Sequence, residues 1–369
     1  MDHLRRYPLL ASMLQPFERR HAKVLSTVIA AIFVAAQARS LNVASVMARW
    51  SGIRLDSALN RLYRLLRNRR VEDEALAEQL LAHVSRRGEV LLAVDWTEWH
   101  SGLRMLVAGA VVGHRGVPIF ARVFDKIVRL RSQNTRENNF ARELARLVRA
   151  VGVKATVLCD RGFRRVSWLA LLDSLDLRFV VRLMDDVSVE QRGVPVSLSA
   201  VGLVRGRVFD LGVVALRKDG AVQARVIGYW APGAKEPWWL ATNSDLPPSR
   251  VLALYDRRMT IEECFRDTKG KRYGAKLGWT RFRDPEKVAR FFHLLAAAML
   301  MWLLLGLYAA KRDPSLRMVS KARGPRQSFI TIGLRIAALD EGPLITPHLL
   351  ELLPEPALRK IAGARRGGK

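Results

Sequence analysis

Residues 255–270, YDRRMTIEECFRDTKG, place two neighbouring acids among an aromatic side chain and several basic ones. On an α-helix, where successive residues turn by about 100°, only one of these acids shares a face with the other chemically useful groups. That face is a stripe about 60° wide, and it contains Tyr255, Arg258, Glu262 and Lys269, with Arg266 at its edge. Glu263 lies well outside the stripe, so we expect Glu262 to be the acid that takes part in chemistry. A simpler interpretation of Glu262, an ion pair with Arg258 one turn away, stays open.

Two further acids, Asp95 and Asp160, each end an apolar run typical of a buried strand, EVLLAVDW at 89–96 and KATVLCDRGF at 154–163. Acids at the ends of neighbouring strands project toward one rim of a sheet, where the Glu262 carboxylate can join them. Three carboxylates without His or Cys make an all-oxygen site, which suits Mg²⁺ or Mn²⁺. Two such ions, about 3.5–4 Å apart, activate a water or a 3′-hydroxyl and stabilise the leaving oxygen of a phosphodiester.

The spacing Tyr-x2-Arg-x3-Glu-x6-Lys is matched in full by Tyr255, Arg258, Glu262 and Lys269. It resembles the signature of DDE transposases of the insertion-sequence-four family. AVDWTEW, with Asp95, and LCDRGF, with Asp160, are similar to that family's first and second aspartate motifs. The resemblance covers nearly the whole chain. It implies an α/β fold: a ribonuclease-H-like mixed sheet with flanking helices, a β-rich insertion, and an all-helical N-terminal DNA-binding region.

On this basis the chain divides into five parts. They are a helical DNA-binding region at 1–87, the first part of the catalytic core at 88–184, the β-rich insertion at 185–245, the second part of the core with the Glu-bearing helix at 246–312, and a basic C-terminal region at 313–369. The C-terminal region is short, which argues against an independent dimerisation domain there.

The activity that the resemblance implies is that of a cut-and-paste DNA transposase, which cleaves donor DNA through a hairpin and joins the 3′ ends to target DNA. Asp95, Asp160 and Glu262 would be its catalytic residues and would bind two Mg²⁺ ions per active site, with Mn²⁺ as a substitute. The residues assigned to DNA phosphate are Tyr255, Arg258, Arg266 and Lys269. The implied partners are double-stranded DNA, from transposon ends and target, and a second copy of the chain in a synaptic dimer.

A tryptophan in the insertion stacks near a flipped base in a relative that shares the signature. PWWLATN offers Trp238 and Trp239 for this role. Two core tryptophans on a strand are the alternative interpretation, although the alternation of side chains along a strand would bury only one of them.

Two other functions are compatible with parts of the pattern. A domesticated DNA-binding derivative would keep the basic helices and lose the acids, all three of which are present. A ribonuclease-H-like nuclease that cuts without strand transfer would keep the acids but would not need the Tyr–Arg–Glu–Lys stripe.

The charge of the chain supports a polyanionic partner. Its 62 Lys and Arg side chains outnumber 34 acids, for a formal net charge of +28. Nucleic acid is the first candidate, an anionic membrane the second, and a generally basic protein from an Arg-rich genome the third. A helix-turn-helix-like break at Ser51-Gly52 is followed by six arginines and a single acid between Arg54 and Arg70. This pattern suits phosphate and groove contact, and a solvated helical face is the alternative interpretation of each arginine.

Two apolar stretches, 24–38 and 291–310, imitate a signal peptide and a membrane span, but both are better explained as helices of a core. The two cysteines, Cys159 and Cys264, form no CxxC pair, and the histidines lack zinc-ligand spacing. We therefore expect no membrane association and a bacterial cytoplasmic protein that joins the nucleoid when it acts.

Overall fold

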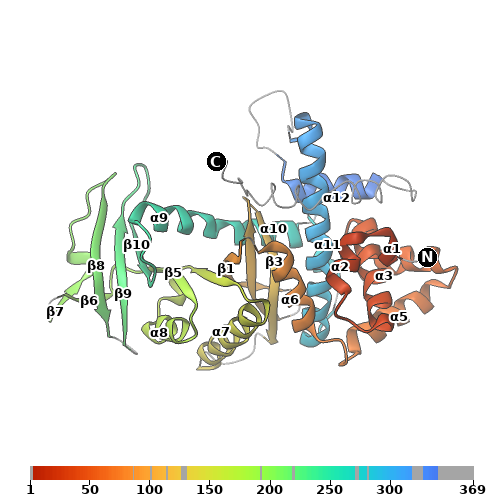
Figure 1. The fold of residues 1–369 in the computed structure, drawn as a ribbon, viewed down its shortest axis with the longest axis horizontal. Coiled ribbons are helices and arrows are strands. Elements are labelled where there is room, and N and C mark those ends of the chain that lie inside the picture. The colour runs from red at the N-terminus through yellow and green to blue at the C-terminus, as the bar shows by residue number, and fades with distance from the viewer. Residues whose placement is uncertain are drawn as a thin grey trace.

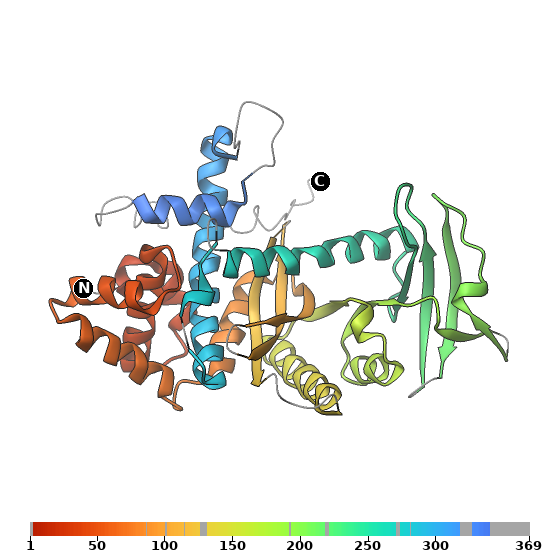
Figure 2. The ribbon, with the colours of Figure 1, turned by 180° about the vertical axis from the view of Figure 1, so that it is seen from behind.

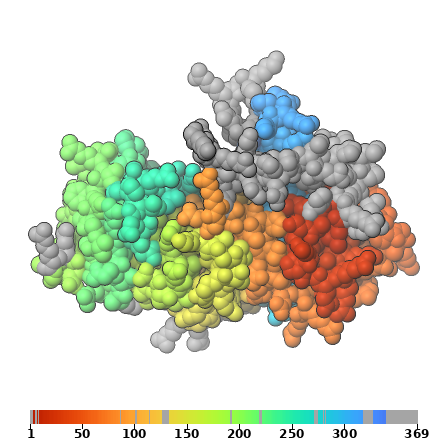
Figure 3. Space-filling model, viewed as in Figure 1, coloured from red at the N-terminus to blue at the C-terminus, as the bar shows by residue number. Residues whose placement is uncertain are grey.

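A mixed β-sheet runs through the molecule (Figures 1 and 2). The helices of the N-terminal region lie beyond one end of this sheet, and the strands that follow residue 185 form its other end. The computed structural model describes residues 3–85, 87–99, 102–113, 115–125, 131–191, 193–217, 221–270, 274–280, 282–317 and 327–339. In the space-filling view the N-terminal helices, in red, and the later strands, in green, lie at opposite ends of an elongated molecule (Figure 3).

The first five strands give the sheet a ribonuclease-H-like order. They are β1 (Glu89–Glu98), β2 (Leu103–Val112), β3 (Arg115–Asp125), β4 (Lys154–Cys159) and β5 (Arg178–Leu183). Their order is β3-β2-β1-β4-β5, in which β1, β2 and β3 are antiparallel neighbours and β4 is parallel to both β1 and β5. The predicted mixed α/β class with flanking helices is thereby confirmed.

The strands after residue 185 extend this same sheet. They are β6 (Ser188–Gln191), β7 (Val194–Ser197), β8 (Val208–Leu216), β9 (Val222–Tyr229) and β10 (Trp238–Thr242). Because β10 pairs antiparallel with β5, the described part of the chain contains one ten-stranded sheet in the order β3-β2-β1-β4-β5-β10-β9-β8-β6-β7. The insertion is therefore joined to the core through backbone hydrogen bonds, and its position relative to β4 is set by β5.

Helices cover both faces of the core strands. Those on one side include α7 (Arg131–Val151) and α8 (Val166–Ser174), and Phe140 of α7 stacks on Phe120 of β3 with ring centroids 5.1 Å apart. The other side is covered by α10 (Thr260–Lys269), and α11 (Pro285–Arg312) packs along β3. Burial on both faces explains why the strands read as nearly continuous apolar runs.

The N-terminal region is helical throughout its described residues. Its helices are α1 (His3–Arg6), α2 (Pro8–Leu14), α3 (Arg19–Ala35), α4 (Ser40–Ser51), α5 (Leu55–Arg67) and α6 (Asp73–Val84). The break between α4 and α5 falls at Gly52, whose φ of +61° is one that glycine adopts without strain. Apolar residues of α3 to α6 line one contiguous core with the rest of the chain.

The long apolar helix α11 is a core helix. It lies between the N-terminal helices and the sheet, in contact with α3, α6 and β3 (Figure 1). Among the described helices it is the one long and apolar enough to cross a membrane, but 89% of its most apolar window is buried inside the fold. Its His293 is also fully satisfied, because Nε2 accepts a hydrogen bond from the Ala121 backbone at 3.3 Å and Nδ1 lies 2.8 Å from the Ala289 carbonyl.

The described C-terminal part comprises a short 3₁₀ helix, η5 (Pro314–Arg317), and α12 (Phe329–Leu339), which crosses α11. Gly306 and Gly333 make this crossing possible, because a Cβ at either position would overlap the backbone of the facing helix. Further 3₁₀ helices are η2 (Leu198–Ala200) and η4 (Leu277–Trp279). Much of the basic region expected at 313–369 lies outside the described residues.

Candidate active site

Neighbouring strands bring two of the predicted acids together. β1 and β4 run parallel with Val94 opposite Cys159, so the following residues, Asp95 and Asp160, lie side by side. Asp160 directly follows β4, as predicted, and its Oδ1 accepts a hydrogen bond from the Gly162 backbone at 2.8 Å. The prediction that Asp95 ends its strand was wrong, because β1 continues to Glu98 in antiparallel pairing with β2.

The third acid comes from a helical segment that is broken, contrary to the single helix expected over residues 255–270. Helix α9 (Pro248–Asp256) ends one residue after Tyr255, a 3₁₀ turn, η3, spans Arg257–Met259, and α10 begins at Thr260. Glu262 therefore lies in the first turn of α10, and Arg258 lies in the turn before it. The 3₁₀ turn alters the angles computed for a continuous helix, yet it leaves the two side chains on the same side.

Two glycines of the sheet allow α10 to come close enough for Glu262 to reach the acids. A Cβ at Gly116 of β3 would stand 2.5 Å from the Thr260 carbonyl oxygen, and one at Gly109 of β2 would stand 2.8 Å from Cδ1 of Ile261. Both distances are far below normal van der Waals contact. The start of α10 thus rests on positions of the sheet that only glycine can fill without a shift.

Arg258 is the centre of the site. Its Nη2 lies 2.8 Å from Oδ2 of Asp95 and 3.7 Å from Oδ2 of Asp160, and its Nη1 donates to Oε1 of Glu262 at 2.9 Å. The Arg258 side chain is 10% exposed, and its Nε is buried without a hydrogen-bond partner among the described residues. One cation therefore stands among three carboxylates that come from two strands and a helix.

Asp95 is the most buried of the three acids, and both burial and the neighbouring charges act on its pKa. Burial is the main cause that raises the pKa of Asp95 to about 6, Asp160 and Glu262 raise it further, and Arg258 opposes the shift. The guanidinium thus compensates only part of the charge, as expected for one cation among three carboxylates. A further positive group would find a favourable place here.

By donor chemistry the three carboxylates fit a hard divalent cation such as Mg²⁺. Their arrangement around Arg258 is not that of a metal site. In the described ranges, no group of three or more His, Cys, Asp or Glu side chains surrounds a common point suited to a metal ion. The residues fit the ion by type, whereas in the structure the three carboxylates pair with the Arg258 guanidinium.

The other residues of the signature lie around this centre. Tyr255 is 5% exposed, and burial raises the pKa of its phenol to about 12, so it remains a hydrogen-bond donor at neutral pH. Lys269 donates to Oγ1 of Thr97 and to the Glu98 carbonyl at the end of β1, and burial lowers its pKa. Arg266 is exposed in the last turn of α10.

The two tryptophans of the insertion have different surroundings. Trp239 is 2% exposed and packs over Gly228, where an added Cβ would overlap the indole. Trp238 is half-buried, and its ring meets the Tyr255 ring edge-on with centroids 5.0 Å apart. Of the two, Trp238 is the one whose ring contacts Tyr255, a residue of the signature.

Sequence reasoning missed a buried carboxylate that supports Asp95. Glu137 of α7 is 2% exposed and accepts a hydrogen bond from Nε1 of Trp96 at 2.9 Å and another from Arg165 at 2.9 Å. The backbone N–H of Trp96 in turn donates to Oδ1 of Asp95 at 2.7 Å. In the sequence, Glu137 has the polar surroundings of an exposed helix residue, and Trp96, next to Asp95, was the only signal of a buried partner.

Glu263 is turned away from the site, toward Arg115, with Oε2 and Nη1 2.9 Å apart. Beside this pair lies a buried acid of α10, Asp267, which is 8% exposed. Burial is the largest cause that raises the pKa of Asp267 to about 6; Glu263 adds to the shift and Arg115 opposes it. Its Oδ1 lies 3.4 Å from Oγ of Ser328, and its Oδ2 has no hydrogen-bond partner in the described part of the chain.

The raised pKa of Asp267 predicts a stability that falls as pH rises. Its folded-state value lies above the ordinary one, so the stabilisation is complete below about pH 4 and is lost as pH rises through about 6. Asp267→Asn lacks this loss and should gain roughly 1–3 kcal/mol relative to the parent between about pH 4.5 and 7.5. Urea unfolding at both pH values measures this difference, and a difference independent of pH would contradict the prediction.

A ribonuclease-H-like sheet that brings acids from β1, the end of β4 and a following helix to one place defines a class of DNA-processing enzymes. Residues 86–301, more than half of the chain, match the family model of the transposase DDE domain, and the chain belongs to that family. The match spans Asp95, Asp160 and Glu262. A comparison with curated proteins finds none that matches this chain.

Proposed function

We propose that the protein is a cut-and-paste DNA transposase of the insertion-sequence-four type, which binds transposon ends, cleaves the donor DNA and joins the 3′ ends to a target. The observation that carries this proposal is the convergence of Asp95, Asp160 and Glu262 on the guanidinium of Arg258. Its partners would be double-stranded DNA and a second copy of the chain in a synaptic dimer, in the bacterial cytoplasm.

Asp95, Asp160 and Glu262 would hold two Mg²⁺ ions, which supply the activation of a nucleophilic oxygen and the stabilisation of the leaving oxygen. The hydrogen bond from the Trp96 backbone holds Asp95 in place, and that from Gly162 holds Asp160. Glu262 is the most exposed of the three, with 45% of its side chain accessible, so it can turn without disturbing the core.

Arg258 would exchange partners when DNA binds. Its guanidinium carries five N–H donors in a fork that matches phosphate oxygens, and its Nε–H has no partner among the described residues. A phosphate at the rim of the site offers a new acceptor to Arg258 and frees carboxylate oxygens for cations. The protonated Tyr255 and the exposed Arg266 would add phosphate contacts on either side.

Lys269 provides a test of the phosphate contacts. If it leaves Thr97 and Glu98 for a DNA phosphate, Lys269→Ala should reduce the slope of log binding constant against log salt by about one unit. Lys311→Ala, in the exposed last turn of α11, is the matched control and should leave the slope unchanged. An unchanged slope for Lys269→Ala, with lower stability alone, would assign it a structural role.

Cleavage through a hairpin would require a surface for a base that leaves the stack, and we propose Trp238 for it. Stacking on an aromatic side chain is worth roughly 1–3 kcal/mol per base. Trp238→Ala should therefore nick normally but slow the hairpin step about ten- to a hundredfold and accumulate nicked DNA. Gel analysis of the reaction over time measures both steps.

Trp239→Ala serves as the comparison for Trp238→Ala. Its indole is in the core, so its loss should lower the free energy of unfolding by about 3–5 kcal/mol. Slowed hairpin formation in Trp239→Ala but not in Trp238→Ala would contradict the assignment.

The function itself is tested with DNA that carries the genomic sequences flanking the coding region, incubated with the protein and Mg²⁺. Double-strand excision followed by joining of the 3′ ends is the expected result. Cleavage without joining would identify a nuclease instead, and DNA binding without cleavage would identify a DNA-binding derivative.

A further inference from the structure

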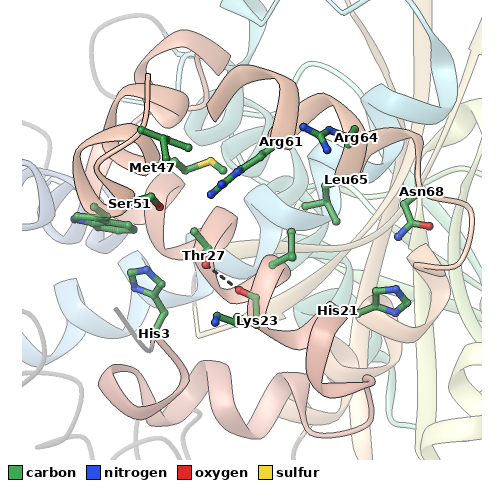
Figure 4. A pocket seen from close by; sticks show the side chains of 13 residues that line it. His3, His21, Lys23, Thr27, Met47, Ser51, Arg61, Arg64, Leu65 and Asn68 are labelled. Carbon is green, nitrogen blue, oxygen red and sulfur yellow. Dashed lines mark hydrogen bonds between the residues drawn. The ribbon is translucent and has the colours of Figure 1, made fainter. Parts of the chain in front are cut away.

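A large cavity lies in the N-terminal region, between α3, α4 and α5 and separate from the acids and Arg258. It has a volume of about 920 Å³, and Figure 4 shows its side chains directed inward from three helices. It is lined by His3, His21, Lys23, Val24, Thr27, Met47, Trp50, Ser51, Ile53, Arg61, Arg64, Leu65 and Asn68. No Asp or Glu is among the lining residues.

The cations of this cavity are available for a ligand. Lys23 of α3 and Arg61 and Arg64 of α5 are exposed, and within the described residues none of the three forms an ion pair. In Figure 4 Arg61 lies across the cavity from Lys23 and Thr27. Three unpaired positive charges that face one space, in a fold already strongly basic, create a site for an anion.

A second cavity provides a contrast, because its charges are already compensated. It has a volume of about 360 Å³ and lies where α6 meets β3 and α11. Arg290 pairs there with Asp73 at 2.8 Å, and Arg122 pairs with Glu74. Asp73 and Glu74 of α6 are thus paired with cations of the core, whereas Lys23, Arg61 and Arg64 form no ion pair within the described residues.

The floor of the first cavity is apolar and includes an aromatic ring. Met47 is 3% exposed and Leu65 is 4% exposed. The indole of Trp50 is half-buried and rests on the His3 ring with centroids 4.4 Å apart. A ligand that fills the space must offer both a flat apolar face and an anionic group.

We propose that this cavity binds an unpaired nucleotide of DNA, with the base against Trp50 and Met47 and the phosphates on Lys23, Arg61 and Arg64. A paired duplex exposes phosphates and sugars but keeps its base faces stacked, so an apolar floor adds nothing to its binding. A nucleotide outside the stack presents both parts. The assignment rests on the proposed function only in that DNA is the substrate.

The test measures binding of fluorescein-labelled oligothymidylate and of blunt duplex by fluorescence anisotropy, without divalent metal so that no cleavage occurs. Thr27→Trp places an indole in the cavity and removes no charge. It should weaken oligothymidylate binding roughly ten- to a hundredfold and leave duplex binding within about twofold. Thermal melting checks that the variant folds.

A charge variant keeps the proposal testable if Thr27→Trp does not fold. Arg61→Ala/Arg64→Ala should weaken oligothymidylate binding and reduce its salt slope by about 1.4 units, at about 0.7 per phosphate contact on single strands. Arg67→Ala, exposed on the same helix but not in the lining, is the matched control and should have the smaller effect.

Three results would overturn the assignment. They are oligothymidylate binding by folded Thr27→Trp as tight as in the parent, equal loss of oligothymidylate and duplex binding, and binding of thymidine monophosphate as tight as that of the oligonucleotide. Failure of the parent protein to excise DNA would reject the transposase function and leave this binding result standing, because the assay involves no cleavage.

Discussion

Replacement of Asp95, Asp160 or Glu262 by Ala is expected to reduce nicking and joining of end DNA by on the order of a thousandfold or more. The reason is that each carboxylate would hold a cation that contributes several kcal/mol to the transition state. Binding to end DNA should persist, because removal of one acid from the site leaves the basic surface intact. Single-turnover cleavage and a gel-shift assay measure the two properties separately.

The matched control for this series is Glu263→Ala. Glu263 neighbours Glu262 in sequence, but it pairs with Arg115 on the other side of α10. It should cleave at the parental rate and lose at most some stability. Full cleavage by Glu262→Ala, together with inactivity of Glu263→Ala, would contradict the assignment of the catalytic glutamate.

Arg258→Ala is expected to show a large stability effect that depends on divalent metal. Without metal, the loss of the central guanidinium leaves Asp95, Asp160 and Glu262 close together without a counter-charge, and the folded state should lose about 3 kcal/mol. Added Mg²⁺ should then raise the melting temperature of the variant more than that of the parent, because no guanidinium competes for the carboxylates.

The same variant should excise poorly even when Mg²⁺ restores its stability, because Arg258 would no longer contact DNA phosphate. Arg258→Lys keeps the charge and loses the fork, so its response to Mg²⁺ should lie between those of the parent and Arg258→Ala. Equal shifts of melting temperature with Mg²⁺ in all three proteins would show that Arg258 and the cation do not share the carboxylates.

Apolar runs in the sequence predicted individual strands well, because a strand that is buried on both faces must consist of apolar residues. The apolar run in KATVLCDRGF predicted a strand that ends at Asp160, and β4 ends directly before that residue. Strand order was available only from the family resemblance, because alternation of apolar residues does not identify neighbours. The same limit explains why the joining of β10 to β5 was not foreseen.

The site was predictable in its residues more than in its geometry. The spacing of the signature placed Glu262 with Arg258, and the structure keeps them in contact even though η3 interrupts the helix. Nothing in the spacing indicated that Arg258 also reaches Asp95 and Asp160, since those contacts span more than ninety residues of chain. Helix periodicity describes the residues of one helix only. The ion pairs of Arg258 also involve an acid of β1 and an acid that follows β4.

The most direct test of the central claim is cleavage of end DNA that carries a phosphorothioate at the scissile position, assayed in Mg²⁺ and in Mn²⁺. If the three acids hold cations against this phosphate, the sulfur should slow cleavage in Mg²⁺, and Mn²⁺, which accepts the softer ligand, should restore it. Cleavage that continues in EDTA, or that is equally fast on both substrates in Mg²⁺, would contradict the account.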